Sequence, residues 1–306
     1  MNEILNKKYS RKSFLFMVVL IATVLILCRY IIFPCIDQSI KTGWLFFFTN
    51  ITDGLLVSLL VSVFIGLFIF WITPDVLKEA KIEIKEPREL PELFESSFPS
   101  TDLWWYKGGC GRYFRTKTLP QMANWARKNS LSREIIAVIL DPSDNEACES
   151  HSNYRRSTAS SELEKNKWDV DQVRIELCTT IITSLVYQHE EPMLRINLYL
   201  CSYYSAFRID LSKEYAIITK EDRKAPAIVC SQNTHFYKSY KEEILLTTKQ
   251  SKQIPQIKTI DFNLDSIDKD HVSKILKEIG IELSTPSVDF YQKVADMCKK
   301  RVNPYE

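Results

Sequence analysis

The hydrophobic pattern of the chain is dominated by two long apolar runs near its start. The first extends from Phe14 to Phe33 and the second from Trp44 to Thr73, and about ten residues join them. A bilayer core takes about 20 helical residues to cross, and a connection this short holds no domain. The pattern therefore predicts a transmembrane hairpin, with helices over residues 14–33 and 44–73.

Small residues recur at every fourth position of the second run, at Gly54, Ser58, Ser62 and Gly66. At 3.6 residues per turn they form one slowly drifting stripe. Membrane helices associate where small side chains let backbones approach, so the stripe predicts a packing face. Its partner is either the first helix or another subunit. The first helix offers only Ala22 and Thr23 as small partners, which favours a homo-oligomer joined through the second helix.

Basic residues flank the hairpin at its two outer ends. Residues 1–13 carry four basic side chains against one acid, and Lys78, Lys81, Lys85 and Arg88 follow the second run. Positive charge marks the cytoplasmic side of membrane helices, so both termini are expected to face the cytoplasm. A cleaved signal peptide is the alternative for the first run, but the apolar core is too long and no small-x-small site precedes the turn.

Two charged residues, Arg29 and Asp53, lie close to the predicted hydrocarbon region. Counted from the cytoplasmic ends at 1.5 Å per residue, Arg29 lies about 22 Å and Asp53 about 30 Å along its helix. Taken singly, each is expected to reach the headgroup region. The alternative is a pair that fixes the hairpin or lines a polar path between several copies.

The rest of the chain shows the pattern of a globular α/β domain. Residues 74–100 mix charges with four prolines and are expected to form a semi-rigid linker. Residues 101–306 are long enough for one domain with a full core. Apolar periodicity predicts a mixed sheet covered by helices, ending in C-terminal helices. Helices are expected over 119–128, 169–191, 235–247, 268–279 and 286–301, and strands over 134–140, 194–201, 207–211, 215–219, 227–230 and 258–264.

Composition narrows the function further. The formal net charge of +2 provides no general case for nucleic-acid binding. Of the eight cysteines, six follow the hairpin without paired C-x2-C spacing. They are expected to be reduced and mostly buried.

A glycine-rich, basic and aromatic segment from Trp104 to Pro120 is the candidate binding site. Gly108, Gly109 and Gly111 lie within four positions of one another. Glycines allow close backbone approach, cations meet phosphate and aromatic rings stack on bases. A glycine-rich turn between core aromatic residues explains the same pattern. The side chains expected to meet a ligand or partner are Trp104, Trp105, Lys107, Arg112, Arg115 and Lys117.

Catalytic and metal-binding motifs are weak in this sequence. There is no G-x-S-x-G and no H-E-x-x-H, and the one S-x-x-K begins at Ser266 without companion motifs. Cys148-x2-His151 and Cys230-x4-His235 each resemble half of a metal site without a second half. Asp141 ends a predicted strand, where it either acts in a site or simply stops the strand. We therefore expect no enzyme activity, no metal and no cofactor.

Residues Tyr204 to Glu243 resemble the second part of a phospholipase D-like half-domain. The similarity lies in Phe207-Arg208-Ile209-Asp210, the strand that follows, Ser231-Gln232-Asn233 and Glu242-Glu243. That family carries an H-x-K-x4-D motif, but Phe207 stands about where the histidine would be. The resemblance therefore implies a degenerate, binding-only member of the fold.

The overall layout resembles the two-transmembrane effectors encoded beside bacterial retron reverse transcriptases in anti-phage defence. The shared pattern is the short basic N-terminus, the hairpin and a cytosolic domain carrying the Trp104–Pro120 segment. The resemblance implies an inner-membrane toxin held inactive by the reverse transcriptase and its RNA-linked DNA, and released in abortive infection. It assigns no catalytic residue. A membrane-tethered enzyme acting on lipid or nucleotide, and a signalling receptor, are the alternatives.

Overall fold

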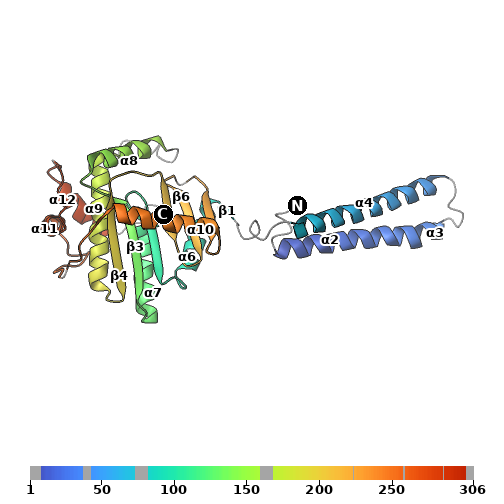
Figure 1. Cartoon of the computed structure of the whole chain (residues 1–306), viewed down its shortest axis with the longest axis horizontal. Helices are drawn as coiled ribbons and strands as arrows, with labels where there is room; N and C mark the ends of the chain where they lie inside the picture. Colours follow the sequence, from blue (N-terminus) through green and yellow to red (C-terminus); the bar gives the residue numbers. More distant parts are fainter. Residues whose placement is uncertain are drawn as a thin grey trace. The chain divides into compact units, whose positions relative to one another are not determined.

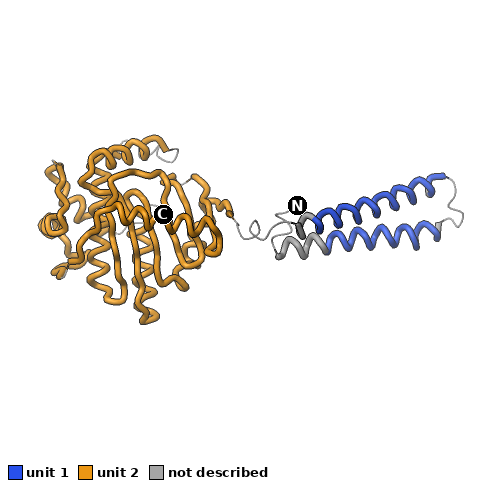
Figure 2. The backbone as a smooth tube through the Cα atoms, in the orientation of Figure 1, with its two compact units in different colours: residues 1–79 blue, residues 80–306 orange. Residues whose placement is uncertain are grey.

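The computed structural model describes residues 8–36, 43–72, 82–158, 168–222, 224–257, 259–284 and 286–300. The chain divides into two compact units, Met1–Glu79 and Ala80–Glu306 (Figure 2). The first seven residues of the predicted basic N-terminus, the first eight residues of the predicted linker (74–81), and Arg301 at the end of the last predicted helix lie outside the described residues.

The first unit is a pair of antiparallel helices (Figure 1). One arm consists of α2 (Lys8–Leu27), the π-helical turn η1 (Cys28–Ile32) and α3 (Phe33–Ile36), and the other is α4 (Trp44–Ile72). Both arms are long and apolar enough to cross a membrane, over Phe16–Cys35 and Phe46–Phe68, with mean hydropathies of 2.6 and 2.2. The predicted helical hairpin is therefore confirmed as a pair of apolar helices.

The α4 face that lies against the first arm has its own spacing, which differs from that of the small stripe. The less exposed side chains of α4 are Thr49, Thr52, Asp53, Leu56, Leu59, Val63 and Gly66. Apart from the adjacent pair Thr52 and Asp53, successive members are three or four residues apart, which is the spacing of a helix that packs along one partner. Medium-sized side chains, rather than glycine and serine, thus make most of the contact inside the hairpin.

The second unit is built on an eight-stranded mixed sheet with the order β1-β7-β6-β5-β2-β3-β4-β8. β2, β3 and β4 are parallel, and every other neighbouring pair is antiparallel. The central strand β3 is an apolar run, as expected of a strand covered on both faces. The strands are β1 (Ile82–Lys85), β2 (Leu103–Lys107), β3 (Arg133–Leu140), β4 (Leu194–Cys201), β5 (Phe207–Leu211), β6 (Tyr215–Lys220), β7 (Ala227–Ser231) and β8 (Lys252–Gln253).

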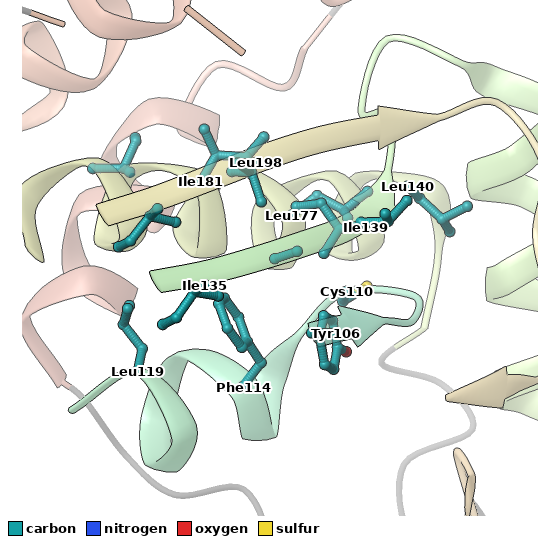
Figure 3. Close-up of a cluster of buried hydrophobic side chains, with 14 of the residues drawn as sticks. Tyr106, Cys110, Phe114, Leu119, Ile135, Ile139, Leu140, Leu177, Ile181 and Leu198 are labelled. Atoms are coloured by element: carbon teal, nitrogen blue, oxygen red, sulfur yellow. The ribbon is translucent and has the colours of Figure 1, made fainter. Parts of the chain in front are cut away.

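Helices cover both faces of this sheet (Figure 1). The core lies between the sheet and α9, where Leu177 and Ile181 meet Ile139 and Leu198 (Figure 3). α10 covers the other face. The helices and helical turns are η2 (Pro87–Glu89), α6 (Leu90–Ser97), η3 (Phe114–Thr118), α7 (Leu119–Asn129), α8 (Asn145–Ser157), α9 (Val170–Glu190), α10 (His235–Gln250), α11 (Lys269–Glu278) and α12 (Phe290–Lys300).

The predicted mixed sheet covered by helices is confirmed, and several elements differ from the prediction in detail. Residues 82–100 belong to the globular unit and not to a linker, because β1 pairs with β7 and the side chains of Phe94 and Phe98 are buried against Trp104. The predicted strand over 258–264 is absent from its described residues, which form a loop. The last helix starts at Phe290, four residues after Pro286.

Candidate functional site

In the hairpin, Arg29 and Asp53 form a direct ion pair. Arg29 Nε donates to Asp53 Oδ1 at 2.9 Å. Counted from the turn instead of the outer ends, Arg29 lies about 10 Å before Ile36, and Asp53 about 14 Å after Trp44, at 1.5 Å per residue. The two charges are therefore almost level along the hairpin.

The small-residue stripe lies mainly outside the contact between the two arms. Gly54, Ser58 and Ser62 are exposed, and a methyl group added at Gly54 would meet nothing within 4 Å. Gly66 is buried. Residues four apart drift by about 40° around a helix, so about 120° separates Gly54 from Gly66. One end of the stripe thus joins the hairpin interface and the other three residues remain available for another surface.

In the globular unit, chemically active side chains converge at one edge of the sheet. The carboxyl ends of β2 and β4 lie there because these strands are parallel, and that of β6 joins them because two antiparallel steps separate β6 from β2. Cys110 follows β2, Tyr204 follows β4 and Glu221 follows β6. Helix α8 adds His151 and Arg155. The carboxyl edge is where open α/β sheets place ligand sites.

Cys110, His151 and Glu221 make a continuous chain of polar contacts. Cys110 Sγ lies 3.6 Å from His151 Nδ1, and His151 Nε2 lies 2.5 Å from Glu221 Oε2. Cys110 and His151 are only 2% and 1% exposed. We call these three residues the thiol cluster. A thiol, an imidazole and a carboxylate in this order are the parts of an activated nucleophile.

Burial and neighbouring charges act differently on the two acids of the thiol cluster. Burial raises the pKa of the Glu221 carboxyl, but His151, followed by Arg155 and Arg208, outweighs it and lowers the pKa to about 2. Burial raises the pKa of the Cys110 thiol, and the carboxylates of Glu221 and Glu176 add to this effect. Glu221 is therefore ionised at neutral pH, whereas the sulfur carries its proton in this arrangement.

Aromatic and basic side chains enclose the thiol cluster. The His151 ring packs edge-on against Trp168 and Tyr204, at centroid distances of 5.8 and 5.0 Å. Arg155 Nη1 donates to the Glu221 carbonyl at 2.6 Å, and its guanidinium lies 4.5 Å from the Trp168 ring. The buried Tyr204 hydroxyl has no hydrogen-bond partner among the described residues. This arrangement holds the imidazole in one position.

The glycines before and after Cys110 permit this packing. A methyl group at Gly109 would lie 2.5 Å from Glu221 Oε1 and 2.8 Å from His151 Nε2. Gly111 has φ +69°, a left-handed conformation that favours glycine. The glycine-rich turn therefore lets the backbone approach the imidazole–carboxylate pair.

Two neighbouring cavities adjoin the thiol cluster. The inner one has space of about 10 Å³ and is lined by Cys110 and His151, with Arg112, Arg155 and Arg208 around it. The outer one measures about 210 Å³ and has mainly apolar walls. Both are lined by Tyr113, Arg208 and Glu221, so the two cavities share part of their walls.

The two tryptophans of the predicted binding segment are part of the core. Trp104 is fully buried, stacks on Phe94 and Phe98, and donates from Nε1 to Asp210 Oδ1 at 3.3 Å. Trp105 is also buried, on the opposite face of β2, below Lys241 of α10. Neither ring presents a stacking surface for a base.

The basic residues of the same segment are mostly paired with acids. Lys107 Nζ donates to Glu243 at 2.5 Å and to Tyr203 at 2.8 Å. Glu176 binds Arg115 from within the core, and lies 3.3 Å from Arg112 Nε. Arg112 also packs over Trp168, and Lys117 is half-buried. Ligand contact by Arg112 or Lys117 stays a prediction, whereas Lys107 and Arg115 are buried.

Cys148 and His151, the residues of the first half-motif, face different partners. Cys148 donates to the Asp141 carbonyl, whereas His151 faces Cys110. Asp141 itself accepts from the Ser143 N–H at 2.8 Å and closes the turn after β3. Within the described ranges, no three histidine, cysteine or acidic side chains are placed to hold a metal ion.

The sequence pattern did not predict the thiol cluster, because its members are far apart along the chain. Cys110 and His151 are 41 residues apart, and His151 and Glu221 are 70 apart. Only the sheet order brings them together. The available signal was Gly-Gly-Cys-Gly between a strand and a helix, followed by a histidine in a separate element.

Comparisons with known proteins give little guidance. No family model matches the chain, and no curated protein matches it. Among solved structures, it is similar to TrmBL2, described as an archaeal chromatin protein with a novel mode of DNA binding, at a TM-score of 0.33 and 7% identity. The match covers 68% of this chain and 66% of that one, just under two thirds of the TrmBL2 chain. A TM-score of this size assigns neither a fold family nor a function.

Proposed function

We propose that the chain is a toxic effector of the bacterial inner membrane, anchored by its two apolar helices. The length and hydropathy of both helices support a two-pass arrangement. Basic residues outside the hairpin support a cytoplasmic location for both termini and for the globular unit. Membrane lipids are then its immediate surroundings.

The observation that carries the proposed toxicity is the exposed part of the small stripe. Gly54, Ser58 and Ser62 remain outside the hairpin contact, which uses Leu56, Leu59 and Val63 instead. In lipid, small side chains gain contact energy by letting a second helix approach closely. The α4 helices of several copies therefore associate through this surface, and the resulting oligomer disrupts the membrane. Membrane damage in this proposal needs no bond-making centre.

The Arg29–Asp53 pair supports the same function. Each charge is partly exposed on the hairpin surface, with 30% and 48% of the side-chain area accessible. Ionisable groups at this depth are costly unless they are paired or line a polar path. The pair holds the two arms level in one copy and offers polar groups to a path formed between copies.

Regulation is proposed from the retron resemblance. The globular unit binds the reverse transcriptase with its RNA-linked DNA, and this complex keeps the hairpins apart until infection. Any nucleic-acid contact is made through that partner, because the net charge of +2 supports no general attraction for DNA. Release of the complex allows the hairpins to associate.

The experiment compares two double variants of α4 in cells carrying a membrane-potential dye. Ser58→Leu with Ser62→Leu blocks the stripe. Val57→Leu with Val61→Leu is the matched control, because both valines are exposed and lie on an adjacent face. Induced expression of the native chain and of the control should depolarise cells, and the serine variant should not. All three should reach the membrane fraction equally.

Two outcomes would count against the proposal. Depolarisation by the serine variant at the native level removes the stripe from the mechanism. Absence of depolarisation by the native chain, in cells without the reverse transcriptase, removes membrane disruption itself.

A further inference from the structure

The thiol cluster is a site that the proposed membrane action does not use. Its residues come from three separate places: the turn after β2, helix α8 and the end of β6. Cys110 is one of six buried cysteines in the globular unit. Cys148 and Cys178, in contrast, make no hydrogen bond to a histidine within the described residues. An imidazole in contact with the sulfur therefore sets Cys110 apart.

The direction of the contacts fits a base that takes a proton from the thiol. An ionised Glu221 accepts from Nε2–H of His151, which places a proton on that nitrogen. In the neutral imidazole Nδ1 is then an acceptor, and it is the nitrogen that faces Cys110 Sγ at 3.6 Å. Glu221 does not reach the sulfur, so it is a positioning residue that fixes the tautomer and the ring orientation.

A helix begins shortly after Cys110. Helical backbone begins at Arg112, two residues after the cysteine, and continues through η3 into α7. The N–H groups at a helix start stabilise negative charge nearby. This location, after a strand and directly before a helix, is also common for nucleophiles in α/β enzymes.

The two cavities limit the size and polarity of a substrate. The inner cavity, at about 10 Å³, has room for roughly one water-sized group beside Sγ. This small space excludes a long acyl chain from the sulfur. The outer cavity, at about 210 Å³, is lined by Leu90, Phe94 and Tyr113 and suits an apolar alcohol portion.

We propose that Cys110 is a nucleophile that accepts a short acyl group from an ester with an apolar alcohol portion. The thiol proton moves to His151 Nδ1 as sulfur bonds to the carbonyl carbon. The ester C–O bond then breaks, and His151 returns the proton to the departing alcohol. The products are a thioester on Cys110 and the free alcohol. Water then hydrolyses the thioester to the acid and restores the thiol.

The test uses the full-length chain in detergent with p-nitrophenyl acetate, and needs no variant. After an acid quench, peptide mass spectrometry measures acetylation of each cysteine. Cys110 should be acetylated at least about tenfold faster than Cys148 and Cys178, since a positioned base typically accelerates a reaction by about 100-fold or more. Equal or slower acetylation of Cys110, together with no p-nitrophenolate release above that of buffer, would overturn the proposal.

If the thioester on Cys110 is hydrolysed before the acid quench, variants show the role of each residue. Cys110→Ser should abolish p-nitrophenolate release and the control Cys148→Ser should not. His151→Asn should lower the rate about 100-fold. Glu221→Gln should lower it about tenfold, with part of the loss recovered in Glu221→Asp, which restores the charge. Tryptophan fluorescence verifies folding of each variant. Release that persists unchanged in folded Cys110→Ser would also overturn the proposal.

Discussion

Arg29 Nε and Asp53 Oδ1 lie 2.9 Å apart and join the two arms of the hairpin near its turn. If this ion pair is needed for membrane action, exchanging its two residues should restore what either single substitution removes. Arg29→Leu or Asp53→Leu alone should leave insertion intact but remove most of the depolarisation. The exchange of both residues, Arg29→Asp with Asp53→Arg, should recover it. The measurement is dye fluorescence at matched protein levels, and full activity of both single variants would exclude the pair from the membrane action.

The lowered pKa of Glu221 predicts that acid destabilises the globular unit. Its pKa in the folded chain is about 2, below the ordinary value of 4.5. A lowered pKa adds stability above the unfolded value, which is then lost as the pH falls toward the folded value. The difference corresponds to about 3 kcal/mol. Urea unfolding followed by tryptophan fluorescence should show this loss between about pH 4.5 and pH 2 in the native chain.

The control for this pH effect is Glu221→Gln, which has no carboxyl group at the site. Its stability should be lower at neutral pH and should fall less steeply in the same pH window. Parallel curves for the two proteins would mean that Glu221 does not produce the acid sensitivity.

Gly109→Ala should destabilise the globular unit. The added methyl group would lie 2.5 Å from Glu221 Oε1 and 2.8 Å from His151 Nε2, so the imidazole–carboxylate pair would have to move. Forcing extra volume into a packed site costs about 1–3 kcal/mol. Gly280→Ala is the comparison, because its Cβ meets only Lys252 Nζ at 3.7 Å, although its φ is +70°. Denaturant midpoints measure the loss of stability. Gly109→Ala should also slow acetylation of Cys110, and an unchanged rate would contradict the close approach.

Arg115→Glu should unfold the globular unit rather than alter binding of a partner. Arg115 is buried and bonds to Glu176, Thr180 and Met297. Reversing its charge leaves two carboxylates facing each other in the core, and breaking a buried pair costs about 3–5 kcal/mol. Lys117→Glu is the matched control in the same segment, because Lys117 is only half-buried. Thermal unfolding in detergent separates the two, and equal melting temperatures would show that Arg115 is not structural.

Much of the fold could be predicted because its strongest elements are locally consistent. The long apolar runs predicted both arms of the hairpin, and Asp169 caps α9 by accepting from the Gln172 N–H, as its position before the helix predicted. β3, β4 and β5 are apolar or β-branched runs that end at turn residues.

The elements that were missed depend on distant contacts. Ile82 and Ile84 alternate with charges in only four residues, and pairing with β7 makes them a strand. Helix α8 is polar, and it is held where His151 and Arg155 reach Glu221. The thiol cluster was not predictable for the same reason, since parallel strand ends bring its members together.

The sheet begins with β1, which is hydrogen-bonded to β7 alone and is the first described element after the two apolar helices. Nine residues, 73–81, connect it to the end of α4. The connector therefore leads first to an edge strand and then to α6, whose Leu90 and Phe94 line the outer cavity. Leu90 lies five residues after the end of β1, so a ligand in this cavity would contact the segment that opens the globular unit.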